Sequence, residues 1–154
     1  MPRPLIRLLA ILATLGLLAS ITTASASAAS ANATRVYLIS MDGAQEAPGP
    51  GDPDASGEAI VIVNPNNDTV CFLMRWRDID GTVTASHIHN GAAGVPAGVV
   101  VPLFVSASFD GTAKARGCVS DNGWADEINA NPSGFYVNVH STIFPPGAIR
   151  GQLG

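Results

Sequence analysis

The chain has 154 residues, with eight basic residues, twelve acidic residues and a formal net charge of −4. This acidic balance argues against nucleic acids and anionic membrane surfaces as partners, because both bind a basic protein face. The chain contains only three histidines, so any histidine metal site must use all of them.

The N-terminus has the pattern of a Sec-type secretory signal. Arg3 and Arg7 form a basic start, residues 8–21 are an apolar run broken only by small residues, and an Ala/Ser-rich stretch follows. We expect residues 1–28 to be the signal, with cleavage between about residues 26 and 33, and the protein to be secreted. An uncleaved anchor is the weaker alternative, because the apolar run is short for a bilayer span.

Without the signal, six basic and twelve acidic residues remain, a net charge of −6. The roughly 120–130 residues of the mature chain suffice for one domain with a core and hardly for two. We therefore expect a single domain over residues 35–154, with no nucleic-acid partner and no membrane segment in the mature form.

The mature chain predicts short strands separated by turn-forming residues. A single helix is predicted at 122–131, where Asp121 could cap the start and Pro132 ends it. About seven short strands at this spacing predict an all-β, antiparallel sandwich or barrel. The predicted strands cover residues 35–40, 57–63, 69–76, 83–89, 99–104, 134–140 and 148–153.

Cys71 and Cys118 both lie in the exported part of the chain. An even pair of cysteines in an oxidising compartment predicts a disulfide, which would stabilise the fold by about 3–4 kcal/mol. The alternative is that the thiolates bind a metal together with the histidines. It is less favoured, because the close cysteine spacing of a zinc knuckle is absent.

All three histidines lie in two strand-like motifs, residues 86–90 and 137–141. Side chains alternate along a strand, so His87 and His89 point the same way, with Cα atoms about 7 Å apart. If the strand that carries His140 lies beside them, the three imidazoles form a candidate copper or zinc site.

Asn138, Arg150 and the histidines each have both a functional and a structural interpretation. Asn138 would share a face with His140 and could orient a metal ligand. Arg150 is expected to hydrogen-bond across strands or to pair with a carboxylate such as Glu46, in preference to binding a ligand. The histidines themselves could be structural, donating hydrogen bonds that tie loops to the sheet.

Two further functions find little support in the sequence. The acidic residues Asp52, Asp54 and Glu58 lack the alternating ligand pattern of a calcium loop, so a solvated loop is favoured. No nucleophile elbow, readable pair of catalytic carboxylates or phosphate-binding loop is present. If the protein is an enzyme, a metal would have to supply the chemistry.

Several segments, taken in order, resemble the CHRD domain, named after chordin and common in secreted bacterial proteins. The resemblance covers residues 35–154 and implies an immunoglobulin-like β-sandwich. In chordin these modules belong to an extracellular antagonist of growth factors, but a shared family does not fix a function. The segments are GAQEAP at 43–48, ASHIH at 85–89, VVVPL at 99–103, FYVNVH at 135–140 and FPPGAIRGQL at 144–153.

Three hypotheses from different classes follow. The first is a secreted, non-enzymatic β-sandwich that binds one copper or zinc ion through the three histidines. The second is an extracellular module that binds a protein or a glycan, with structural histidines. The third is a small metalloenzyme with the metal at the same three side chains.

Overall fold

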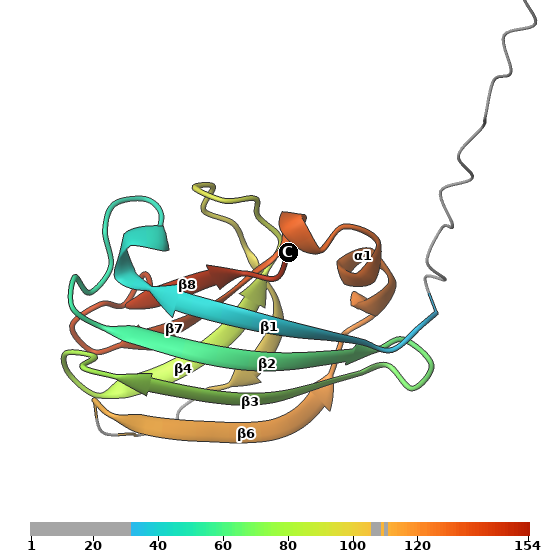
Figure 1. Ribbon diagram of the computed structural model, residues 1–154, viewed down its shortest axis with the longest axis horizontal. Coiled ribbons are helices and arrows are strands. Elements are labelled where there is room, and N and C mark those ends of the chain that lie inside the picture. The colour runs from blue at the N-terminus through green and yellow to red at the C-terminus, as the bar shows by residue number, and fades with distance from the viewer. Residues whose placement is uncertain (1–31, 106–108, 110) are drawn as a thin grey trace, which may run out of the picture.

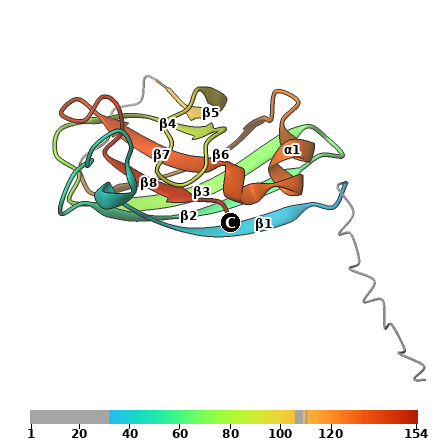
Figure 2. The same ribbon diagram turned by 90° about the horizontal axis from the view of Figure 1, so that it is seen from above.

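The computed structural model describes residues 32–105, 109 and 111–154. In these residues, eight antiparallel strands form one sheet in the order β5-β4-β7-β8-β1-β2-β3-β6. The sheet curls into a nearly closed barrel or sandwich, in which β4, β7 and β8 lie across from β1, β2 and β3 (Figures 1 and 2). The strands are β1 (Arg35–Asp42), β2 (Ser56–Asn64), β3 (Thr69–Arg77), β4 (Val83–His89), β5 (Val99–Phe104), β6 (Ala113–Ser120), β7 (Tyr136–Ser141) and β8 (Ile149–Gln152).

The predicted all-β fold is confirmed, and its seven predicted strands correspond to β1–β5, β7 and β8. β7 begins two residues later than predicted, because Pro132–Gly134 forms a 3₁₀ turn before it. The predicted signal peptide, residues 1–28, lies outside the described residues. Within the described ranges, no helix is both long enough and apolar enough to cross a membrane.

The core lies between the two layers and is filled by inward-pointing side chains from both. Val61 and Val63 of β2 and Val70 of β3 are fully buried, as are Ile88 of β4 and Val137 of β7. Each such aliphatic side chain contributes about 1.5–3 kcal/mol by leaving water. Because side chains alternate along a strand, this burial also determines which side chains point outward.

Aromatic rings fill the seam between the edge strands β5 and β6, which contact each other there. The ring centroid of Phe104 on β5 lies 6.3 Å from that of Phe72 and 6.1 Å from that of Trp76, both on β3. Phe109 packs edge-on against Trp76 and Phe104, at 5.4 Å from each. Such pairs contribute about 0.5–1.5 kcal/mol beyond their buried area. The seam is therefore closed by packing of side chains.

The sequence does not predict β6, the eighth strand. Its inward positions begin with Ala113, Ala115 and Gly117, and its outward positions are polar, so no run of β-branched or aromatic residues marks it. Tertiary pairing with β3 determines its conformation. Gly117 lies opposite Phe72, and a Cβ atom at this glycine would come within 3.2 Å of the Phe72 ring.

The helix α1 (Ala125–Ala130) is shorter than predicted. Its start is delayed because Asn122 and Gly123 have positive φ values of 54° and 82°, outside the helical region. The Asp121 carboxylate accepts hydrogen bonds from the backbone N–H of Gly123 at 2.8 Å and of Ala125 at 3.1 Å. Asp121 therefore stabilises the start of the shorter helix.

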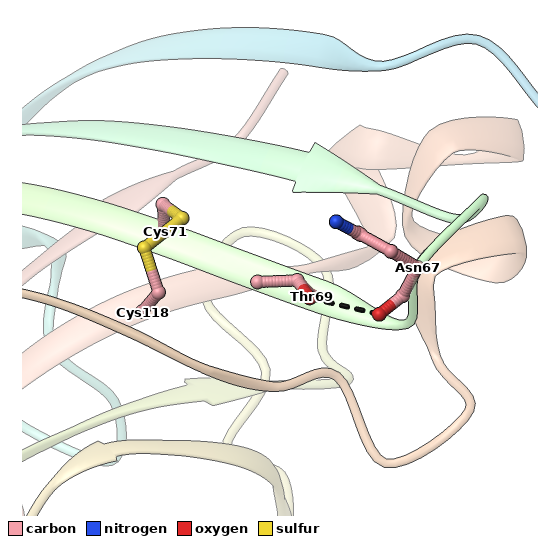
Figure 3. Close-up of a disulfide and its surroundings, with 4 residues drawn as sticks. All are labelled: Asn67, Thr69, Cys71 and Cys118. Atoms are coloured by element: carbon pink, nitrogen blue, oxygen red, sulfur yellow. Dashed lines mark hydrogen bonds between the residues drawn. A yellow bond between two sulfur atoms is a disulfide. The ribbon is translucent and has the colours of Figure 1, made fainter.

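The predicted disulfide joins Cys71 of β3 to Cys118 of β6, which lie directly opposite each other in the strand register. Figure 3 shows it near the β2–β3 turn, where the Thr69 hydroxyl donates to the Asn67 carbonyl at 2.8 Å. Because β6 has a hydrogen-bonded neighbour on only one side, the bond fastens an edge strand to the sheet. It also commits both cysteines, so that the thiolate alternative for a metal site is wrong.

Replacing both cysteines, Cys71→Ser and Cys118→Ser, should lower the free energy of unfolding by about 3–4 kcal/mol, because the bridge restricts the unfolded chain. Guanidinium unfolding of the oxidised wild type and the double variant measures the difference. The reduced wild type serves as the control and should match the variant. Equal stability of all three samples would contradict a stabilising bridge.

Candidate metal centre

The pairing of β4 with β7 brings the three histidines together. His89 lies opposite Tyr136 and His87 opposite Asn138, while His140 lies diagonally next to His87. All five side chains point to the outer face of the sheet, because the residues between them fill the core: Ile88, Val137 and Val139. The condition for a three-histidine site, that the two motifs lie side by side, is therefore met, because β4 pairs with β7 (Figure 2).

One nitrogen from each of the three rings can converge on a single ion. The ligand atoms of His87, His89 and His140 all lie within 4.8 Å of one another. His87 Nδ1 and His140 Nε2 lie 3.0 Å apart. A tetrahedral zinc ion with Zn–N bonds of about 2.0–2.1 Å requires N···N separations of about 3.3 Å. Small side-chain rotations would thus bring the three nitrogens to coordination distance, and the group could hold a metal ion.

Two of the rings have their orientation set by backbone carbonyls. His89 Nδ1 lies 2.8 Å from the Ala97 carbonyl, and His140 Nδ1 lies 2.9 Å from the Pro145 carbonyl. A carbonyl oxygen only accepts, so Nδ1 carries the proton in both rings. In the neutral rings the lone pair therefore resides on Nε2, which in His140 lies 3.0 Å from His87 Nδ1 and in His89 lies next to the Asn138 amide. Histidines that bind metals typically donate their second nitrogen in this way.

Burial keeps the imidazoles in the neutral form that binds metals. The pKa of His87 is lowered to about 4, first by burial and then by the charges of His140 and His89. Burial is also the main cause that lowers the pKa of His89 and of His140. Protonation of one ring opposes protonation of its neighbours, because like charges this close repel.

Arg150 lies under the loop that follows β4 and contacts the histidines through Tyr136. It is 1% exposed, and its guanidinium carbon lies 3.4 Å from the centroid of the Tyr136 ring, which stacks on His89 at 4.7 Å. The guanidinium donates to the carbonyls of Ala92 at 2.7 Å and Val95 at 3.1 Å. Arg150 therefore fixes the loop after β4, and the same loop supplies the Ala97 carbonyl that accepts from His89.

The ion pair of Arg150 with Glu46 does not form among the described residues. The hydrogen bonds of Arg150 go to the loop carbonyls and to Gln152, while its charge attracts the Glu46 carboxylate from a distance. Gln152 in turn donates to backbone carbonyls, among them that of Gly91 at 3.0 Å. The sequence pointed to Arg150 but not to these carbonyl partners, because a loop's path is not encoded in strand periodicity.

The Asn138 side chain lies between His89 and the Glu46 carboxyl. His89 Nε2 lies 3.0 Å from Asn138 Oδ1, and the Asn138 side chain also bonds to the Glu46 carboxyl. Burial raises the pKa of Glu46 to about 7, against the opposing effect of Arg150 and of the hydrogen bonds. Its Oε1 atom is buried and has no hydrogen-bond partner in the described residues, so ionisation would leave a charged oxygen unpaired.

Of the acidic residues considered for calcium, Asp52 interacts with Asp54, but Glu58 does not join them. Asp52 is fully buried and accepts a hydrogen bond from the backbone N–H of Asp80 at 2.6 Å. Glu58 instead forms an exposed ion pair with Arg75 at 2.6 Å. In the part of the chain that the structure describes, the three histidines are the one group of three or more side chains suited to a metal. The expectation of a solvated loop is wrong for Asp52, whose side chain is buried.

Glu46→Gln should make stability less dependent on pH. The folded-state pKa of about 7 lies above the ordinary value of 4.5, so the carboxyl's contribution is present below pH 4.5 and lost as pH rises through 7. Glutamine mimics the neutral form, and the variant should therefore be more stable than the wild type at pH 8 and similar at pH 4. Denaturant unfolding over this pH range measures the difference. Exposed Glu127→Gln is the control, and a difference that does not change with pH would contradict the assignment.

Comparison with known proteins identifies the family. The family model described as the CHRD domain matches residues 37–153. No curated protein and no solved structure matches the chain. The matched residues run from β1 to the segment after β8 and include all three histidines, both cysteines, Glu46, Asn138 and Arg150. The chain therefore belongs to the CHRD domain family.

Proposed function

We propose that this protein is a secreted, metal-binding β-sandwich that holds one copper or zinc ion through His87, His89 and His140. The observation that carries the proposal is the convergence of three neutral imidazoles within 4.8 Å on one sheet face. Two of these rings already donate Nδ1–H to backbone carbonyls, which leaves their lone pairs on Nε2 and available to a metal, and Nε2 of His140 lies 3.0 Å from His87 Nδ1.

The ligand chemistry narrows the choice of metal. Neutral imidazole suits copper and zinc, whereas calcium and magnesium require oxygen ligands. Both cysteines are committed to the disulfide, so the site would be made of nitrogen ligands. Three protein ligands leave a fourth position for water or an exogenous ligand, as in catalytic zinc sites. We favour binding of the metal itself as the function, and a metalloenzyme is the runner-up.

Secretion and the absence of nucleic-acid and membrane partners belong to the same proposal. A disulfide is stable in the oxidising compartments outside the cytoplasm, which supports export through the predicted signal at residues 1–28. The excess of acidic residues supports a partner other than nucleic acid or an anionic membrane. A protein with a net negative charge attracts cations, and extracellular metal ions are such a partner.

A titration of the purified protein with copper and zinc, followed by calorimetry, tests the proposal. We expect one ion per chain and sub-micromolar affinity, lost in His87→Ala, His89→Ala and His140→Ala. The exposed change Asn66→Ala, in the β2–β3 turn, is the matched control and should leave binding intact. Thermal unfolding of each metal-free variant shows whether the loss of affinity is a loss of fold.

The outcomes separate the three hypotheses. Loss of binding with the metal-free fold retained supports the metal site. No saturable binding, or binding that is indifferent to all three changes, contradicts it and favours structural histidines. If binding is confirmed, turnover assays of the metal-loaded protein against hydrolytic and redox substrates decide between a binding protein and a metalloenzyme.

The pH dependence of binding gives a second test. Protons compete with the metal for imidazole nitrogen, and an unperturbed histidine would lose the competition near its pKa of about 6.5. Because the pKa of His87 is lowered to about 4, the ring stays neutral in more acidic solution. We therefore expect affinity to persist at pH 5.5, where a peptide that carries the same HIH motif should have lost most of its affinity. If the protein and the peptide lost metal affinity to the same extent as the pH falls, the preformed site would be contradicted.

A further inference from the structure

The outward side chains of β1, β2, β3 and β6, here called the outer face, form rows that run across four strands. The strands are adjacent in this order, and their registers align the side chains. One row consists of Leu38, Ile60, Leu73 and Arg116, and its neighbour of Val36, Ile62, Cys71 and Cys118. A third row consists of Ser40, Glu58, Arg75 and Lys114.

The first two rows expose an unusual amount of aliphatic surface. Leu38 is 78% exposed, Val36 59%, Leu73 48% and Ile60 37%, and these residues are neighbours across three strands. Scattered apolar residues on a protein surface need no explanation, but a contiguous patch usually marks an interface. The patch therefore needs an occupant.

The charges of the outer face identify that occupant, because they are sorted by strand. The acidic residues Asp42 and Glu58 lie on β1 and β2. The basic residues lie on β3 and β6, which carry four of the six basic side chains in the described part of this acidic protein: Arg75, Arg77, Lys114 and Arg116. The outer face thus has an acidic half, a basic half and a boundary between β2 and β3.

We infer that a second copy of this chain packs on the outer face, related by a two-fold axis parallel to the strands along the β2–β3 boundary. Such an axis preserves each row and exchanges its halves, so Arg75 faces Glu58 of the second copy and Leu73 faces Ile60 of the second copy. At the centre of this interface the acidic Glu58 meets the basic Arg75 and apolar residues meet apolar ones, whereas at its margins Leu38 faces Arg116 and Ser40 faces Lys114 of the second copy. A C₂ interface requires this self-complementarity, and sheets pack face to face in this aligned manner.

The size of the outer face is adequate for a weak dimer. Four strands spaced about 4.8 Å apart, each with about eight residues rising 3.4 Å, give roughly 500 Å² in projection per copy. Two copies would bury about 1,000 Å², the lower limit of specific interfaces. A cleft of about 830 Å³ crosses the strands between the charged residues, lined among others by Asp42, Glu58, Arg75 and Lys114. Two such clefts would face each other and retain water around the charges.

Charge reversal provides a test that a single chain cannot mimic. Glu58 and Arg75 form an exposed ion pair within one chain, so their loss has little effect on the fold. In a dimer of Glu58→Arg, arginine would face arginine, and in a dimer of Arg75→Glu, glutamate would face glutamate. Each single variant should be monomeric. An equimolar mixture of the two should form a heterodimer, because both facing pairs then have opposite charge.

Sedimentation velocity over a concentration series, with a chelator present so that the metal plays no part, measures the outcome. We expect a reversible dimer for the wild type, weakened by Leu73→Asp, which would place a carboxylate against Ile60 of the second copy. The control Ile143→Asp, at a residue that is 60% exposed in the β7–β8 turn, should have no effect. Circular dichroism checks that each variant is folded. A wild type that stays monomeric at all concentrations, or a dimer that survives Leu73→Asp and both charge reversals, would overturn the inference.

Discussion

The hydrogen-bonded pairing of β4 with β7 is the constraint on which the histidine cluster depends. Ile88, Val137 and Val139 are fully buried on one side of these strands, which forces the residues between them to the other side. A register shift of one residue would bury imidazoles in the core and expose valines. The apolar core on one face therefore determines the position of the polar group on the other.

This position has an energetic cost that the surrounding loops offset. His89, Asn138 and Arg150 are almost completely buried although they lie outside the barrel interior. Buried polar groups are tolerated when their hydrogen bonds are made. Here the partners are largely carbonyls of the loops that cover the sheet, at Ala92, Val95 and Ala97. The loops and the strands thus stabilise each other, with Arg150 as the link.

The sequence predicts what depends on local pattern and misses what depends on tertiary contacts. Alternation and turn residues located seven of the eight strands, and composition located the disulfide partners. β6 was missed because its inward residues are small and its conformation depends on pairing with β3. The stacking of Tyr136 on His89 and the burial of Glu46 were missed for the same reason, since both depend on how loops fold over a face. The one sequence signal for these contacts was the alternation in Tyr136–His140, which places Tyr136, Asn138 and His140 on the same face of the strand.

The two proposed sites lie on opposite layers of the fold. The histidine cluster is on the outer face of β4 and β7, whereas the surface for a second copy is on the outer face of β1, β2, β3 and β6 (Figures 1 and 2). In a face-to-face dimer, both histidine clusters would point away from the interface and stay open to solution. The apolar core between the layers contacts both, but close-packed aliphatic side chains do not by themselves couple two sites. Metal binding and association should therefore be thermodynamically independent, which is why a chelator can be used to study one without the other.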